Sequence, residues 1–160
     1  KSISNAYEYA NYTKLRNETV FSFIFFAKSI NNFDDDVRIS KRIFIPSRKL
    51  RGFAAGKIGP KDSDDFIGGN YGTAMNFAAT LPNFMKDLEN IDFSLFMDTA
   101  NVWGVDYNSS LDSNKIRSST GIAVDWFTPI GPLSFSLASP ITKSSTDETE
   151  TFRFRIGTTF

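Results

Sequence analysis

The chain has 160 residues, of which 18 are basic and 18 acidic, so its formal net charge at pH 7 is zero. A neutral chain without a run of Lys and Arg has no electrostatic attraction for nucleic acid, so we expect no nucleic-acid partner. Histidine and cysteine are both absent, which excludes disulfides, thiol nucleophiles, catalytic triads that need histidine, and metal sites with histidine ligands.

The longest uninterrupted apolar stretch, Phe23 to Ala27, is far shorter than the roughly 18 residues of a membrane helix, which excludes a helical membrane protein. Apolar side chains instead recur at every second position, the period of a β-strand with two different faces. In chain order, this alternation predicts seven strands, at 6–14, 19–29, 73–79, 91–98, 121–126, 133–138 and 149–160. It is clearest in 133–138 and 152–157, and ambiguous in 19–29, where both faces carry apolar residues. We therefore predict an all-β fold, with the strands in an antiparallel up-and-down meander.

The connections between these strands alternate in length. Those at 15–18, 82–90 and 128–132 are short, whereas those at 31–67, 104–115 and 142–148 are longer. In a meander, alternate connections lie at opposite ends, so one end has tight turns and the other has loops, as in bacterial outer-membrane barrels. The strands also have the length, about ten residues, that crosses a bilayer when tilted. Such barrels use an even number of strands, at least about 8, so residues 1–160 would be the C-terminal portion of a larger barrel domain.

A soluble β-sandwich that acts as a binding module is the alternative. Its strands alternate in the same way, with the apolar face turned toward a second sheet. The two folds differ in what covers that face, which is lipid in the barrel and protein in the sandwich.

The long connection, about 31–67, carries the densest motif in the sequence. Connections of this length are uncommon, and they usually serve as lids, plugs or binding segments, or are disordered. This one contains Arg51-Gly52-Phe53 followed by Ile58-Gly59-Pro60. A basic, aromatic, glycine-punctuated hairpin suits a segment that packs against another part of the protein.

Further motifs follow along the chain. Gly68-Gly69-Asn70 opens a strand, Phe96-Met97-Asp98 and Asn101-Val102-Trp103 close one, and the chain ends in Phe152-Arg153-Phe154-Arg155-Ile156-Gly157-Thr158-Thr159-Phe160. Together with the motifs of the long connection, this set resembles the Omp85 family of outer-membrane proteins, from about residue 39 to the last residue. The resemblance implies the C-terminal part of the barrel of an assembly factor, which folds and inserts other barrel proteins into the bacterial outer membrane.

The same resemblance implies partners. These are the outer-membrane lipid bilayer, unfolded outer-membrane protein clients, and accessory assembly lipoproteins that bind through POTRA domains absent from this chain, as are the N-terminal strands. No covalent chemistry is implied, so we expect neither enzyme activity nor a cofactor nor a metal. Another Omp85-type member, such as a TamA-like assembly factor or a two-partner secretion transporter, is the alternative within the family.

The family pattern also assigns roles to residues. The long connection would fold into the barrel lumen and present Arg51 to Asp98 on the barrel wall. Strand alternation agrees, because Asp98 lies on the face opposite Leu95 and Met97, and a charge at bilayer depth must face the lumen and find a partner. Where the pattern leads us to expect a second acidic partner, this sequence has Ala78.

The last strand would form the seam of the barrel, where incoming client strands are templated. Its residues are Phe152, Phe154, Ile156, Gly157 and Phe160. The alternation places Phe160 on the lipid face with Phe154 and Ile156, near the periplasmic interface, where an aromatic ring anchors a strand. Gly157 has no side chain and would favour a bend or weakened pairing.

Overall fold

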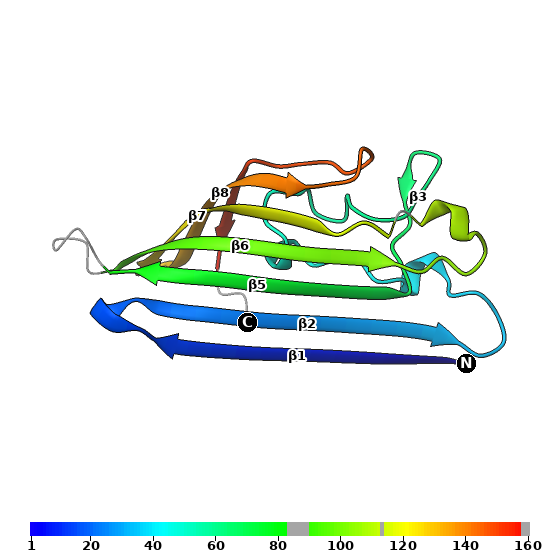
Figure 1. Cartoon of the computed structure of the whole chain (residues 1–160), viewed down its shortest axis with the longest axis horizontal. Helices are drawn as coiled ribbons and strands as arrows, with labels where there is room; N and C mark the ends of the chain where they lie inside the picture. The colour runs from blue at the N-terminus through cyan, green and yellow to red at the C-terminus, as the bar shows by residue number, and fades with distance from the viewer. Residues whose placement is uncertain (83–89, 113, 158–160) are drawn as a thin grey trace.

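The computed structural model of the chain describes residues 1–82, 90–112 and 114–157. Its principal sheet has seven antiparallel strands in the order β1-β2-β5-β6-β7-β8-β9 (Figure 1). The strands are β1 (Ser2–Lys14), β2 (Val20–Asn32), β5 (Tyr71–Leu81), β6 (Ile91–Trp103), β7 (Arg117–Thr128), β8 (Gly131–Thr142) and β9 (Phe152–Ile156). Each strand pairs with its neighbour in this chain order, which confirms the predicted up-and-down meander.

The connections contain only short elements. Two strands, β3 (Lys61–Asp62) and β4 (Asp65–Phe66), form a small hairpin inside the long connection. The 3-10 turns are η1 (Arg16–Glu18), η2 (Ile39–Lys41), η3 (Ser47–Lys49) and η4 (Ser109–Leu111). Within the described residues, no helix is long and apolar enough to cross a membrane.

The last strand differs from the prediction. β9 has only 5 residues, whereas we expected a strand over 149–160. Thr149 instead forms an isolated antiparallel bridge with Phe53 of the long connection, so this part of the chain has left the sheet. At the other end, Gly157 has a φ of 101° and forms a bend, and residues 158–160 lie outside the described residues.

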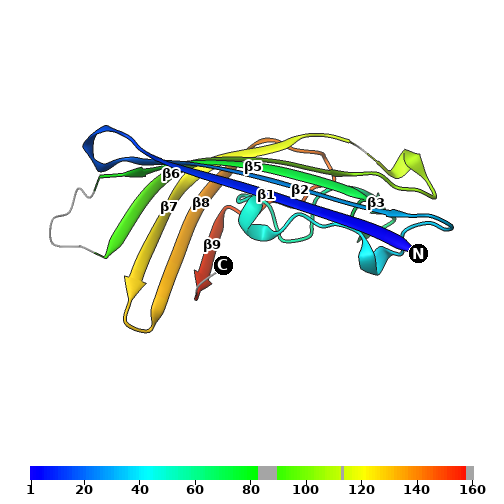
Figure 2. The ribbon, with the colours of Figure 1, turned by 90° about the horizontal axis from the view of Figure 1, so that it is seen from below.

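The sheet curls from β1 round to β9, and the long connection lies on the concave side of the curl (Figure 2). Apolar residues of the connection pack there against apolar residues of β5 and β6. The resulting core contains Ile45, Leu50, Phe53, Ile58, Ala74, Ala100 and Val102. Burial of these side chains holds the connection against the concave face.

The convex face carries the other set of alternating side chains. Leu95, Ile122, Leu137 and Phe152 are successive partners across four strands, and their exposed fractions lie between 48% and 53%. Within the described part of the chain, no second layer covers this face. A soluble sandwich would bury these residues under a second sheet, so the structure favours the barrel.

The ambiguous alternation in 19–29 has a structural explanation. Phe23 packs on Phe77 of the next strand, with ring centroids 5.0 Å apart, and both share the face of Met97. Phe26 has the opposite parity and packs against the buried core under the long connection. Both faces of β2 carry apolar side chains because both faces meet apolar surroundings.

Candidate functional site

The long connection is fixed to β6 of the principal sheet by a bidentate ion pair. Arg51 Nε lies 2.7 Å from Asp98 Oδ2, and its Nη2 lies 2.8 Å from Oδ1. The backbone N–H of Arg51 also donates to Oδ2, at 3.0 Å. Asp98 is fully buried and the Arg51 side chain is only 19% exposed, so solvent screens this pair little.

A second strand completes the polar contacts of Asp98. The Asn76 side-chain amide donates to Asp98 Oδ1 at 2.9 Å and to the backbone carbonyl of Lys49 at 2.7 Å. Asn76 and Asp98 are direct partners on β5 and β6. The same two strand residues therefore hold the backbone on both sides of Leu50.

The guanidinium of Arg51 rests on an aromatic platform. Its carbon lies 3.5 Å from the centre of the Phe96 ring, close enough for a cation–π contact. Phe96 in turn lies over Gly121 of β7, where an added Cβ would come within 2.8 Å of the ring. Gly121 thus makes room for the ring that supports Arg51.

The glycine of the Arg-Gly-Phe motif is required by its backbone and its surroundings. Gly52 has a φ of +89°, which disfavours a residue with a side chain, and a Cβ there would lie 3.1 and 3.2 Å from the Cβ atoms of Ser119 and Ala138. The Ser119 hydroxyl donates to the carbonyl of Arg51. This close contact of the motif with β7 and β8 allows Phe53 to be buried, with 1% exposure.

The second motif meets the wall in a similar way. Ile58 and Pro60 are buried, and Gly59, with a φ of +98°, lies so close to Val102 that an added Cβ would be 2.3 Å from its Cγ1. The two glycine motifs are therefore both points of close backbone approach to the sheet.

The position expected to hold a second acidic partner has a different role. Ala78 packs beside a small cluster of Phe96, Ala123 and Ala138. Among the described residues, Asp98 is the acidic side chain that forms an ion pair with Arg51.

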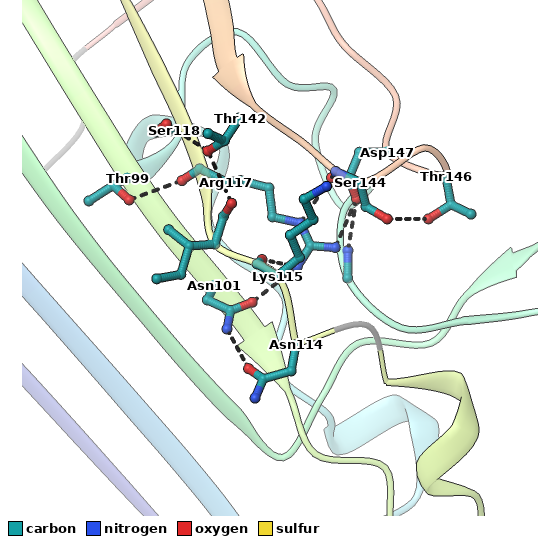
Figure 3. Close-up of polar contacts among 12 residues, drawn as sticks. Thr99, Asn101, Asn114, Lys115, Arg117, Ser118, Thr142, Ser144, Thr146 and Asp147 are labelled. Carbon is teal, nitrogen blue, oxygen red and sulfur yellow. Dashed lines mark hydrogen bonds and ion pairs between the residues drawn. The ribbon is translucent and has the colours of Figure 1, made fainter.

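A buried ion pair that sequence reasoning missed joins β7 to the β8–β9 connection (Figure 3). Arg117 at the start of β7 binds Asp147 in the β8–β9 connection, with Nε–Oδ2 2.9 Å and Nη2–Oδ1 3.1 Å, and both side chains are 0% exposed. Arg117 also donates to the Asn101 side chain at 3.0 Å. Asp147 accepts from the backbone N–H groups of Ser144 at 2.6 Å and Gly59 at 3.4 Å.

The signal for this pair in the sequence is weak. The inward parity of Arg117 on a strand is a hint, since a charge at membrane depth needs a partner. Asp147 lies in a polar connection, where an acidic residue is ordinarily solvated.

The β8–β9 connection also pairs with the long connection through its backbone. The hydrogen bonds run from Ala54 N–H to the Glu148 carbonyl (3.0 Å), from Glu148 N–H to the Lys57 carbonyl (3.0 Å) and from Glu150 N–H to the Gly52 carbonyl (3.1 Å). These bonds flank the bridge between Phe53 and Thr149. Residues 148–150 thus pair with the long connection, whereas Thr151, directly before β9, still accepts a hydrogen bond from Ala138 of β8.

The predicted seam residues lie at the opposite edge of the sheet from β1. Phe152, Phe154 and Ile156 are on the convex face, with 53%, 45% and 68% exposure. The N–H of Gly157 donates to the carbonyl of Pro132 at 2.9 Å. Phe160 lies outside the described residues, so its place on the lipid face stays a prediction.

Comparison with known proteins agrees with this architecture. A family model described as the Omp85 superfamily domain matches residues 1–160. The chain belongs to the Omp85 superfamily. The outer membrane protein assembly factor BamA of Neisseria meningitidis serogroup B is 32% identical over 139 residues, covering 69% of this chain and 17% of that protein. BamA of Neorickettsia risticii is 28% identical over 128 residues, covering 78% of this chain and 17% of that protein.

A solved Omp85 structure has the same fold. The crystal structure of BamA from Haemophilus ducreyi lacking POTRA domains 1–3 superposes with a TM-score of 0.88 and 32% identity. The match covers 96% of this chain and 34% of that one. The chain therefore forms part of the barrel of a bacterial outer-membrane protein, and it spans about a sixth of the length of the curated relatives.

Proposed function

We propose that the protein containing this chain folds and inserts other β-barrel proteins into the bacterial outer membrane. The observation that carries the proposal is the 32% identity with a meningococcal protein named as an outer membrane protein assembly factor. Because both of these curated relatives are named as assembly factors, this function is favoured over polypeptide secretion by a two-partner transporter.

The seam strand supplies a physical mechanism. A membrane strand cannot leave backbone N–H and C=O groups unpaired in hydrocarbon. β9 pairs with β8 along one edge. In the whole barrel its other edge would meet the first strand of the domain, which this chain does not include, and weak pairing there would leave that edge open to a client strand. An incoming strand added to such an edge gains backbone hydrogen bonds before it meets lipid. This mechanism needs templating and no covalent step, and we propose no cofactor, metal or enzyme activity.

The placement of the long connection follows from the same proposal. The convex face meets lipid, so the concave face, with the long connection, faces the lumen. Upstream of this chain, the whole protein would carry the N-terminal strands of the barrel and POTRA domains, as the name of the Haemophilus ducreyi structure indicates for that protein. Accessory assembly lipoproteins would bind through those domains.

Reconstitution of the full-length protein tests this function. Vesicles containing it should accelerate insertion of an unfolded barrel client, measured by the heat-modifiable mobility of the client, relative to vesicles without it. Arg51→Ala and Asp98→Ala should each reduce insertion, and the double variant should be little worse, because either single change already breaks the pair. Arg38→Ala, at an exposed residue of the same connection, is the control.

Two results would contradict the proposal. Equal client insertion with and without the wild-type protein would refute the assembly function itself. Fully additive losses in the Arg51 and Asp98 variants would show that the two residues act separately.

A further inference from the structure

Arg153 joins the last strand to the long connection. Its side chain projects from β9 and is 12% exposed. Nη1 donates to the carbonyl of Ser47 and Nη2 to the carbonyl of Phe53. Nε and Nη2 also bind the Glu150 carboxylate, at 2.8 and 2.6 Å. One guanidinium thus holds both ends of the segment Ser47–Phe53, which we call the loop hub.

The chemistry of the contact suits arginine in particular. Backbone carbonyls in a packed segment need donors, because an unpaired buried carbonyl costs free energy. The planar guanidinium presents several N–H donors in fixed directions, whereas a lysine ammonium is a single point charge. Glu150, in the connection that precedes β9, neutralises the charge and orients the side chain.

The loop hub itself touches strands across the whole sheet. Lys49 is 5% exposed and lies 2.7 Å from Glu8 on β1. Arg51 binds Asp98 on β6, and the Arg51 carbonyl accepts from Ser119 on β7. With Arg153 on β9, the hub contacts both edge strands of the sheet, so a shift of the hub changes the position of the seam strand relative to the wall.

The place where β9 begins explains why this contact matters. β8 has 12 residues, but β9 pairs with it only from Leu133 to Leu137. Beyond that point, the connection before β9 turns inward and pairs with residues 52–57. The seam strand is therefore paired with β8 over its whole length, and the connection directly before it is held by residues 52–57.

We propose that Arg153 is a positioning residue that holds the loop hub and the seam strand together as one unit, and thereby sets the edge offered to a client. The inference rests on the proposed function for its consequence, but the contact itself can be tested without that function. Arg155 provides the contrast. It lies two residues further along β9 with the same parity, and its side chain makes no hydrogen bond or ion pair with the residues that the structure describes.

A cysteine pair reports the contact directly in the full-length protein. Ala54→Cys and Glu148→Cys replace residues joined by a backbone hydrogen bond, in a chain without native cysteine. We expect this pair to oxidise readily in the membrane-embedded protein. Arg153→Gln should lower the yield of the disulfide, because the hub and the connection separate, whereas Arg155→Gln should leave it unchanged. An equal yield in both variants would overturn the inference.

Client insertion then tests the consequence. Arg153→Gln should slow insertion roughly tenfold, the factor expected for loss of a charge-assisted hydrogen bond, and Arg155→Gln should not. Oxidising the cysteine pair in the Arg153→Gln protein should restore insertion, and a reducing agent should remove the gain. Because a disulfide can also stabilise the folded state, the heat-modifiable mobility of the Arg153→Gln protein itself shows whether a loss only reflects poor folding.

The outcomes separate the two proposals. If the wild-type protein inserts no client, the assembly function fails, and the disulfide yield still tests the contact. If the wild-type protein inserts clients but Arg153→Gln matches Arg155→Gln, or the tether restores nothing, the inference fails. Should Arg153→Gln not fold by heat-modifiable mobility, Arg153→Lys replaces it, because it keeps the charge but loses the planar donors.

Discussion

Replacing Asp147 with asparagine isolates the energetic role of the buried Arg117 pair. The variant keeps the size of the side chain and removes its charge, so the fully buried Arg117 guanidinium loses its ionic partner. Removing one member of a buried pair typically costs about 3–5 kcal/mol, because the remaining charge is uncompensated. Asn101 and the Lys115 carbonyl still accept from Arg117, so we expect the lower end of that range, about 3 kcal/mol.

The measurement is the free energy of unfolding in urea of the full-length barrel in lipid vesicles, followed by tryptophan fluorescence. Glu148→Gln is the matched control. Its carboxylate lies 3.7 Å from Lys57 Nζ with about half of each side chain exposed, and an exposed pair contributes about 0–1 kcal/mol.

A second comparison tests the reason for the loss. The double variant Arg117→Met/Asp147→Leu removes both charges, and we expect it to be more stable than Asp147→Asn, because apolar residues of similar volume often replace a buried ion pair without cost. The reasoning would be refuted if Asp147→Asn and Glu148→Gln were equally stable. It would also be refuted if the double variant were the least stable of the three.

Two further predictions concern the Arg51 platform and the chain end. Gly121→Ala should destabilise the barrel by about 1–3 kcal/mol through overpacking and reduce client insertion. The added Cβ would lie 2.0 Å from the Leu137 carbonyl oxygen and 2.8 Å from the Phe96 ring, which supports Arg51. Unchanged client insertion would show that the Phe96 ring does not place Arg51. Deleting Phe160, or replacing it with Asp, should slow membrane insertion of the full-length protein far more than Thr159→Ala, measured by heat-modifiable mobility. Equal rates would show that the terminal aromatic carries no insertion signal.

Strand alternation predicted most of the sheet because the two faces have different surroundings. Leu95 and Met97 lie on the exposed convex face, and Asp98 is buried under the long connection, so parity alone indicated which side chain faces inward. The ambiguous strand was ambiguous for a physical reason, since Phe26 packs into the core while Phe23 lies on the convex face.

The features that were missed depend on contacts between distant segments. The late start of β9 follows from pairing of its preceding connection with residues 52–57, and no local pattern indicates that choice. Arg117 and Asp147 are separated by 30 positions, and the acidic member lies in a turn-like connection. Alternation reports which face a residue occupies, but it cannot report which partner lies opposite when that partner is a loop.

The long connection poses a general problem, because a segment with little regular structure must keep one position against the concave face of the sheet. Apolar burial of Phe53 and its neighbours supplies attraction, but the hydrophobic effect is non-directional and does not select one register. Arg51, Arg117 and Arg153 supply direction, since each guanidinium fixes two or more acceptors in a set geometry. Each also joins a different pair of segments. We conclude that the apolar core keeps the connection on the concave face, while the arginine contacts determine where its backbone meets the sheet, including β9.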